Sequence, residues 1–214
     1  MKFLNFDRVL CLSPHPDDIE YSMLGTILKY SETNFDIFCM SRGGAKGFDK
    51  TNKLDRRKEV LDIWTSLKCK NIRLVFFSDS DYLEDKTEPE WINYIENEFL
   101  KKNKYDCILI PPQKDSMYEH RFVNKFGSAL VRKGAISLVE YNTVSTLNCW
   151  KPNVFVDILN FYKRKISELN KFKSQGGKLY FTKDTLDSFH SNFQCSKRGL
   201  KIVEQFKILE IFER

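Results

Sequence analysis

Short apolar stretches alternate with longer amphipathic stretches along the first two thirds of the chain. The apolar stretches are continuous rather than alternating, which is typical of strands covered on both faces of a parallel sheet. They are rich in Ile, Val, Leu, Phe and Cys. We predict strands at Val9–Ser13, Phe35–Ser41, Ile72–Ser78, Cys107–Pro111 and Ile136–Tyr141.

The amphipathic stretches between these strands repeat apolar residues at helical spacing. They predict helices at Tyr21–Tyr30, Leu54–Leu67, Trp91–Lys101 and Glu119–Arg132. Strands alternating with helices indicate an α/β fold, in which an open, doubly wound and mostly parallel sheet carries helices on both faces.

The pattern changes after about residue 145. Val154–Ile158 and Lys207–Phe212 are candidate strands, and Tyr162–Phe172 is a basic amphipathic helix that stops before Gly176. We interpret the basic run from Lys163 to Lys173 as a solvated helix face. Because no linker or repeat interrupts the chain, we expect a single domain over 1–214, with 145–214 as a small C-terminal extension packed on it.

Composition narrows the function classes. The 214 residues are 42% hydrophobic and 30% charged, which excludes a disordered chain. No apolar run approaches the ~20 residues that span a bilayer, and the first residues lack the long apolar centre typical of a signal peptide, so we expect no export. The net charge of +6 is dispersed rather than gathered, so we expect no nucleic-acid partner. Six cysteines without a CxxC spacing indicate reduced core residues in a cytoplasmic protein.

The segment His15-Pro16-Asp17-Asp18 directly follows the first predicted strand. Ligands of open parallel sheets bind beyond the carboxyl ends of strands, which is where this segment lies. His15 and Asp18 are close enough in sequence to converge on one ion, while Asp17 stays free. One His, one ligating carboxylate and one spare carboxylate are parts of a hydrolytic metal centre, in which bound water needs a base. The alternative is an ordinary strand-to-helix turn capped by aspartates.

A third ligand would come from another strand end. His120 follows the predicted strand Cys107–Pro111 and begins the next helix, so it lies at a second carboxyl edge of the same sheet. Taken alone, His120 is better explained as an exposed residue at a helix start. Together with the His15 segment at the same edge of the sheet, its position favours the interpretation of His120 as a metal ligand.

These residues carry a family resemblance. The chain resembles the LmbE-like, PIG-L family of zinc-dependent N-deacetylases over most of its length. Matching pieces are Pro14–Asp18, Leu24-Gly25-Thr26, Ser41–Gly44, Arg56 with Glu59, Asp115–Arg121, Arg198-Gly199 and Glu204-Gln205-Phe206.

The resemblance implies a Rossmann-like α/β domain that removes an acyl group, usually acetyl, from an amino sugar or its conjugate. It implies that His15, Asp18 and His120 bind zinc, and that Asp17 is the general base. Another divalent metal would suit the same two N and one O ligands. The expected partner is a small N-acylated amino sugar. The oligomeric state, monomer or homo-oligomer, stays open.

Three residues depart from the family pattern. Met117 stands where the family usually has a His that stabilises the intermediate or protonates the leaving amine, and Met can do neither. Glu119 replaces an Asp before His120 and could accept a hydrogen bond from that imidazole. Ile19 replaces a Glu. We hypothesise that Tyr118, His190 or Arg42 supplies the missing donor, although His190 beside Phe189 is better explained as a structural histidine.

Substrate contacts are expected from Arg42, Arg56 and Tyr118. Arg42 opens the glycine-rich stretch Arg42–Gly47, which matches no nucleotide-binding motif and is favoured as a plain loop that could contact an anionic substrate. Trp150 and Pro152 could form the wall of a sugar site, but Trp is equally a core residue.

Three functions therefore compete. The first is a zinc N-deacetylase, and the second is a catalytically impaired relative that binds a glycan or a metal. The third is an unrelated α/β binder of nucleotides or nucleic acid. Metal analysis separates the third from the others, and acetate release from N-acetyl amino sugars separates the first from the second.

Overall fold

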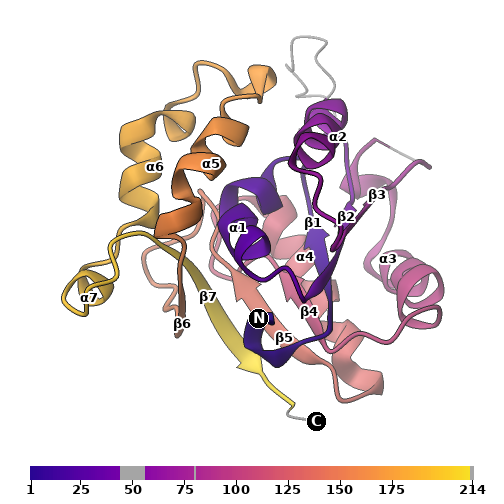
Figure 1. Cartoon of the computed structure of the whole chain (residues 1–214). Helices are drawn as coiled ribbons and strands as arrows, with labels where there is room; N and C mark the ends of the chain where they lie inside the picture. Colours follow the sequence, from indigo (N-terminus) through magenta and orange to yellow (C-terminus); the bar gives the residue numbers. More distant parts are fainter. Residues whose placement is uncertain (44–55, 80, 213–214) are drawn as a thin grey trace.

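The computed structural model describes residues 1–43, 56–79 and 81–212. Seven strands form one sheet in the order β3-β2-β1-β4-β5-β7-β6 (Figure 1). The strands are β1 Arg8–Ser13, β2 Asn34–Cys39, β3 Ile72–Phe76, β4 Cys107–Ile110, β5 Ser137–Tyr141, β6 Val154–Asp157 and β7 Val203–Glu210. The five strands from β1 to β5 are parallel, whereas β7 runs antiparallel to both β5 and β6.

Helices cover both faces of the sheet. Their bounds are α1 Asp18–Lys29, α2 Arg56–Leu67, α3 Glu88–Ile95, α4 Tyr118–Ala129, α5 Leu159–Leu169, α6 Lys183–His190 and α7 Phe193–Ser196. One apolar core unites residues of α1, α2 and α5 with one face of the sheet, and a second core unites α3 and α4 with the other. The α/β architecture predicted from the sequence is confirmed.

The boundaries differ from the predictions in two ways. The predicted third helix ends as an α-helix at Ile95 and continues as a π-helical turn over Glu96–Leu100. The last strand begins at Val203, earlier than predicted. Its first half contains the adjacent polar residues Glu204 and Gln205, which interrupt the apolar run, yet it pairs with β6. The helices α6 and α7 were not predicted. The first residues of the predicted helix Leu54–Leu67, as far as Asp55, lie outside the described residues.

The basic run on α5 is only partly a solvated face, so that prediction is wrong at one position. Lys163, Lys171 and Lys173 are exposed, but Lys165 is fully buried and pairs with Glu204 on β7 at 2.6 Å. Buried charges require a paired and hydrogen-bonded environment, which Glu204 supplies.

Glu204 also links the C-terminal extension to α1. Its carboxylate accepts hydrogen bonds from the backbone N–H groups of Gly25 (2.9 Å) and Thr26 (2.5 Å). Gly25 is required by packing, because a Cβ there would lie 2.8 Å from the side chain of Ile158. The helix that carries Asp18 is therefore fixed from the extension side, and Figure 1 shows α5 next to α1.

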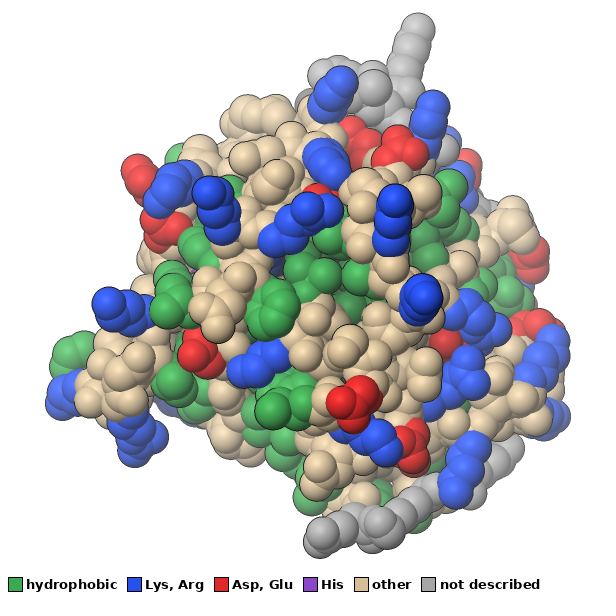
Figure 2. All heavy atoms as spheres, in the orientation of Figure 1, with side chains coloured by type: hydrophobic (Ala, Val, Ile, Leu, Met, Phe, Trp, Pro, Cys, Tyr) green, Lys and Arg blue, Asp and Glu red, His purple; other side chains and the backbone are tan. Residues whose placement is uncertain are grey.

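The surface and the cysteines are consistent with the composition. On the face drawn in Figure 2, Lys and Arg side chains are scattered among Asp and Glu rather than gathered into one patch. All six cysteines are free, and Cys11, Cys39 and Cys107 are buried in adjacent strands. Among the described residues, no helix combines the length and the apolar character needed to cross a membrane.

Candidate metal centre and active site

The site lies where the strand order reverses. In the sheet, β1 has β2 on one side and β4 on the other, so the strand order reverses between β1 and β4. Such a reversal opens a crevice beyond the carboxyl ends of these two strands. His15 lies in the turn after β1, and Asp18 begins α1. His120 lies in the first turn of α4, which follows β4.

The turn after β1 is tightly constrained. Pro16 keeps His15 out of the helical region, and Asp17, the residue before α1, has a φ of 107°. A positive φ is costly for a residue with a side chain and persists at functional sites where the surroundings enforce it. Here the Asp18 carboxylate accepts the His15 backbone N–H at 2.8 Å, and Tyr21 N–H donates to Asp17 O at 2.8 Å.

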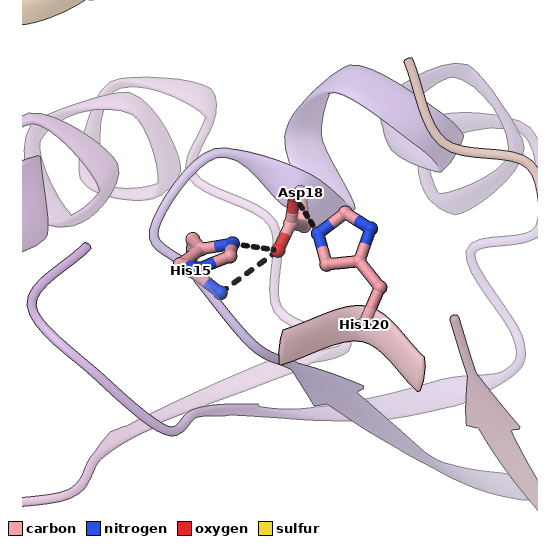
Figure 3. Close-up of side chains that lie close together, drawn as sticks. All are labelled: His15, Asp18 and His120. Atoms are coloured by element: carbon pink, nitrogen blue, oxygen red, sulfur yellow. Dashed lines mark hydrogen bonds and ion pairs between the residues drawn. The ribbon is translucent and has the colours of Figure 1, made fainter. Parts of the chain in front are cut away.

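Three buried side chains converge in this crevice. The Nδ1 of His15 lies 3.2 Å from Oδ2 of Asp18, and Nε2 of His120 lies 3.3 Å from Oδ1 of the same carboxylate. Figure 3 shows the two imidazoles on either side of Asp18. One potential ligand atom from each residue lies within 4.8 Å of the other two, so the predicted ligand set is brought together in space.

A second carboxylate orients His120. Oδ2 of Asp115 lies 2.9 Å from Nδ1 of His120, and it also accepts a hydrogen bond from the Thr143 hydroxyl. A proton on Nδ1 that is donated to Asp115 leaves the lone pair on Nε2, which is the nitrogen that faces Asp18. The sequence suggested Glu119 as a residue that could accept this hydrogen bond, but in the structure the acceptor is Asp115.

Electrostatics at the cluster favour positive charge. Burial alone would raise the pKa of Asp18, but the imidazoles of His120 and His15 lower it overall. Burial alone would lower the pKa of His120, but Asp18 and Asp115 raise it to about 10. The cluster without an ion therefore holds a proton that a divalent cation would have to displace.

Asp17 occupies a different electrostatic environment from Asp18. Burial raises the pKa of Asp17 to about 6, against the opposing effect of the Arg56 guanidinium. Arg56 Nη1 lies 3.4 Å from Oδ2 of Asp17. Adjacent carboxylates with separated pKa values are typical of sites in which one binds and the other moves a proton.

A cavity of about 330 Å³ contains this cluster. His15, Asp17, Asp18 and His120 line its floor. Its walls include Tyr21, Arg56, Met117, Glu119 and Val144.

The C-terminal extension supplies the remaining wall, which sequence reasoning missed. Lys178, Tyr180 and Phe181 line the cavity. They lie in a stretch of short turns between α5 and α6 that has neither the strand nor the helix period, so no local pattern indicated their position. The Lys178 ammonium lies 5.5 Å from the centre of the Tyr180 ring.

Of the three predicted substrate-binding residues, one lines the cavity and two do not. Arg56 lines the cavity, whereas Arg42 and Tyr118 are not among its lining residues. Arg42 instead pairs with Asp81 at 3.2 Å, and Tyr118 is exposed and stacks on Phe122. The stretch from Ala45 to Gly47 lies outside the described residues, as does Gly44.

None of the three donors hypothesised to replace the missing His lines the cavity. Arg42 and Tyr118 are placed as above, and His190 is fully buried with Nδ1 donating to the backbone oxygen of Leu186 at 2.7 Å. Met117 itself lines the cavity, as expected for the position where the family usually has a His. Its side chain has no polar hydrogen to donate.

Comparisons with known proteins agree with this geometry. The family described as PIG-L, GlcNAc-PI de-N-acetylase, matches residues 10–131, which is more than half of the chain. Diacetylchitobiose deacetylase of Thermococcus kodakarensis is 23% identical over 201 residues, covering 81% of this chain and 72% of that protein.

Solved structures share the fold. N,N'-diacetylchitobiose deacetylase from Pyrococcus horikoshii superposes with a TM-score of 0.75 and 22% identity, covering 97% of this chain and 85% of that one. A 4-carboxy-2-hydroxymuconate hydratase from Pseudomonas putida gives 0.72 and 16%, covering 100% and 98%. Similarity of fold therefore does not by itself specify the reaction. The resemblance predicted from the sequence is confirmed: the chain belongs to the PIG-L family of amino-sugar de-N-acetylases.

Proposed function

We propose that this chain is a zinc-dependent hydrolase that removes the N-acetyl group from an amino sugar or an amino-sugar conjugate. The observation that carries the proposal is the convergence of His15, Asp18 and His120 on one point, with Asp17 in the same cavity. We further propose that residues 1–214 act as one unit, since the extension supplies a wall of that cavity.

The donor set fits a divalent metal such as zinc. Zinc takes His nitrogen and Asp oxygen at about 2.0–2.2 Å, which places tetrahedral ligand atoms about 3.3 Å apart. His15 Nδ1 lies 3.2 Å from Oδ2 of Asp18, and His120 Nε2 lies 3.3 Å from the other oxygen, Oδ1. One potential ligand atom from each of the three residues lies within 4.8 Å of the other two. Nε2 of His120 is buried and has no hydrogen-bond partner among the described residues, so a metal would satisfy it. When bound at His15, Asp18 and His120, the ion would lower the pKa of a water molecule and polarise the amide carbonyl.

In this proposal Asp17 removes the proton from the attacking water. Its carboxylate is free of the ligand set and lines the cavity beside Asp18. The Arg56 guanidinium at 3.4 Å favours the charged form that a base needs, while burial keeps its pKa high enough to accept a proton.

Lys178 is proposed to supply the positive charge that Met117 cannot. Among the described residues, no hydrogen bond or ion pair holds its ammonium. Partial burial lowers its pKa, and the nearby Arg56 guanidinium lowers it further, which makes the ammonium a better acid. Tyr180 is less suited, because its hydroxyl donates to Gln175 Oε1 at 3.2 Å.

The compartment is proposed from the cysteines. Buried thiols without disulfides at Cys11, Cys39 and Cys107 suit a reducing compartment such as the cytoplasm.

The test is acetate release by the zinc-loaded protein from N-acetylated amino sugars, run beside Asp17→Asn. We expect about one zinc per chain and turnover that the variant lacks. Stoichiometric zinc with no turnover of any acetylated sugar would favour the catalytically impaired alternative that Met117 raises. A protein that holds no metal would contradict both.

A further inference from the structure

A second groove adjoins the active-site cavity. It has a volume of about 480 Å³ and is walled by the loop between β5 and β6, by β7 and by α7. Three aromatic and five amide side chains line it. The aromatic residues are Trp150, Phe155 and Phe189, and the amide residues are Asn142, Asn148, Asn192, Gln194 and Gln205.

The chemistry of the groove suits neutral polyhydroxylated ligands. Amide side chains both donate and accept hydrogen bonds, as sugar hydroxyls do, and aromatic faces pack against the C–H faces of sugar rings. In the described part of the chain, the side chains of Asn142, Asn148 and Gln194 have no hydrogen-bond partner. The indole N–H of Trp150 is already donated to Glu140 at 2.7 Å, which leaves its ring as the lining surface.

The groove and the cavity of the metal centre share a lining residue. Val144 lines both the groove and the cavity. The loop that carries Val144 is fixed to the metal-centre segment, because the Thr143 hydroxyl donates to Asp115 and Leu147 N–H donates to Lys114 O at 2.9 Å. The groove therefore lies next to the cavity and is a place for the next segment of a molecule whose acetamido group reaches His120.

We propose that the groove binds neutral sugar units joined to the N-acetylated sugar, so that the substrate is an oligosaccharide rather than a single sugar or a sugar nucleotide. This inference rests on the proposed deacetylase function. Among the described residues that line the groove, Lys151 is the one ionisable side chain and none is a carboxylate. A nucleotide diphosphate would need more cationic side chains than the single lysine among these lining residues.

The first test compares chito-oligosaccharides of one, two and three units as substrates of the zinc-loaded enzyme. We expect kcat/KM to rise at least tenfold from one unit to two. In an Asn142→Ala, Gln194→Ala double variant the ratio between long and short substrates should fall about tenfold, since two hydrogen bonds are lost. Asn160→Ala, on the exposed start of α5, is the matched control and should keep the wild-type ratio.

A binding measurement separates failure of this inference from failure of the proposed function. The three-unit sugar is titrated into zinc-loaded Asp17→Asn, with calorimetry and tryptophan fluorescence as readouts. Binding that weakens when the groove amides are removed supports the inference even if no sugar is hydrolysed. Equal binding with and without those amides, an absence of binding, a kcat/KM independent of chain length, or a preference for a uridine diphosphate sugar over the two-unit sugar would each overturn it.

Discussion

Oδ2 of Asp115 lies 2.9 Å from Nδ1 of His120, and the same oxygen accepts the Thr143 hydroxyl. One carboxylate therefore orients a proposed metal ligand and anchors the loop between the cavity and the groove. Glu119, directly before His120 on α4, cannot do this as easily, because consecutive helical side chains point about 100° apart.

Removal of this carboxylate should weaken metal binding without abolishing it. We expect Asp115→Asn to reduce zinc affinity about 10- to 100-fold, as is typical when the acceptor behind a ligating imidazole is lost. Competition with a chromophoric chelator measures the change. Asp184→Asn, at an exposed position on α6, should bind zinc like the wild type. Equal affinities for the two variants would show that Asp115 has no part in metal binding.

The ligand set is tested directly by metal content. His120→Ala removes one of three ligands and leaves Asp18 without one of its two neutralising imidazoles, so zinc per chain should fall well below one after dialysis. Elemental analysis gives the stoichiometry. His190→Asn serves as the control, because His190 contacts Leu186 and lies outside the cluster. An unchanged zinc content in His120→Ala would place the third ligand elsewhere.

Asp17 should control turnover rather than metal content. We expect Asp17→Asn to retain zinc while kcat falls about 10²- to 10⁴-fold, the usual contribution of a general base. In the wild type the base must be ionised, so kcat/KM of the zinc-loaded enzyme should fall at acid pH, with this limb below about 6, the pKa of Asp17 without a bound cation. A bound cation stabilises the carboxylate and moves this limb to lower pH. Full activity of the variant would refute the assignment.

Lys178 should matter most for poor leaving groups. We expect Lys178→Met to lower kcat about 10²-fold or more for an N-acetyl amino sugar, since an alkylamine must be protonated as it departs. The loss should be much smaller for an activated acetyl ester, whose leaving group needs no proton. Lys173→Met, another exposed lysine of the extension, controls for the loss of a charge. Equal losses on both substrates would assign Lys178 to substrate binding instead.

His190 predicts an acid sensitivity of the fold. Burial, followed by the Lys165 ammonium, lowers the pKa of His190 well below 6.5, so the folded protein keeps this imidazole neutral. Below about pH 6.5, His190 is protonated in the unfolded chain but stays neutral in the folded protein. The free energy of unfolding should therefore fall by up to about 1.4 kcal/mol per pH unit from this residue.

Urea unfolding at pH 7 and pH 5 measures this effect. His190→Asn retains a donor for the Leu186 oxygen but does not titrate, so its stability should depend less on pH than that of the wild type. Parallel pH dependences for the two proteins would contradict the role of His190.

The order of elements could be predicted because each strand and helix carries its own period, and buried parallel strands are nearly continuous apolar runs. The positions of His15 and His120 could be predicted for the same reason, since both follow strands and the carboxyl ends of parallel strands share one edge. The irregular stretch from 170 to 182 has no period, so sequence reasoning left Lys178 and Tyr180 unplaced. The burial of Lys165 could not be predicted either, because the carboxylate that pairs with it belongs to Glu204 on β7, far away in the sequence.

The residues by themselves determined the α/β class, the family and the His-Asp-His set, because these depend on local periodicity and on a short motif at a strand end. Tertiary structure alone decided that Asp115 rather than Glu119 supports His120, that Arg56 rather than Arg42 reaches the cavity, and that the C-terminal extension forms its far wall. Such contacts join segments distant in sequence, and their distances are set by how the helices and β7 pack on the sheet, which no local pattern records.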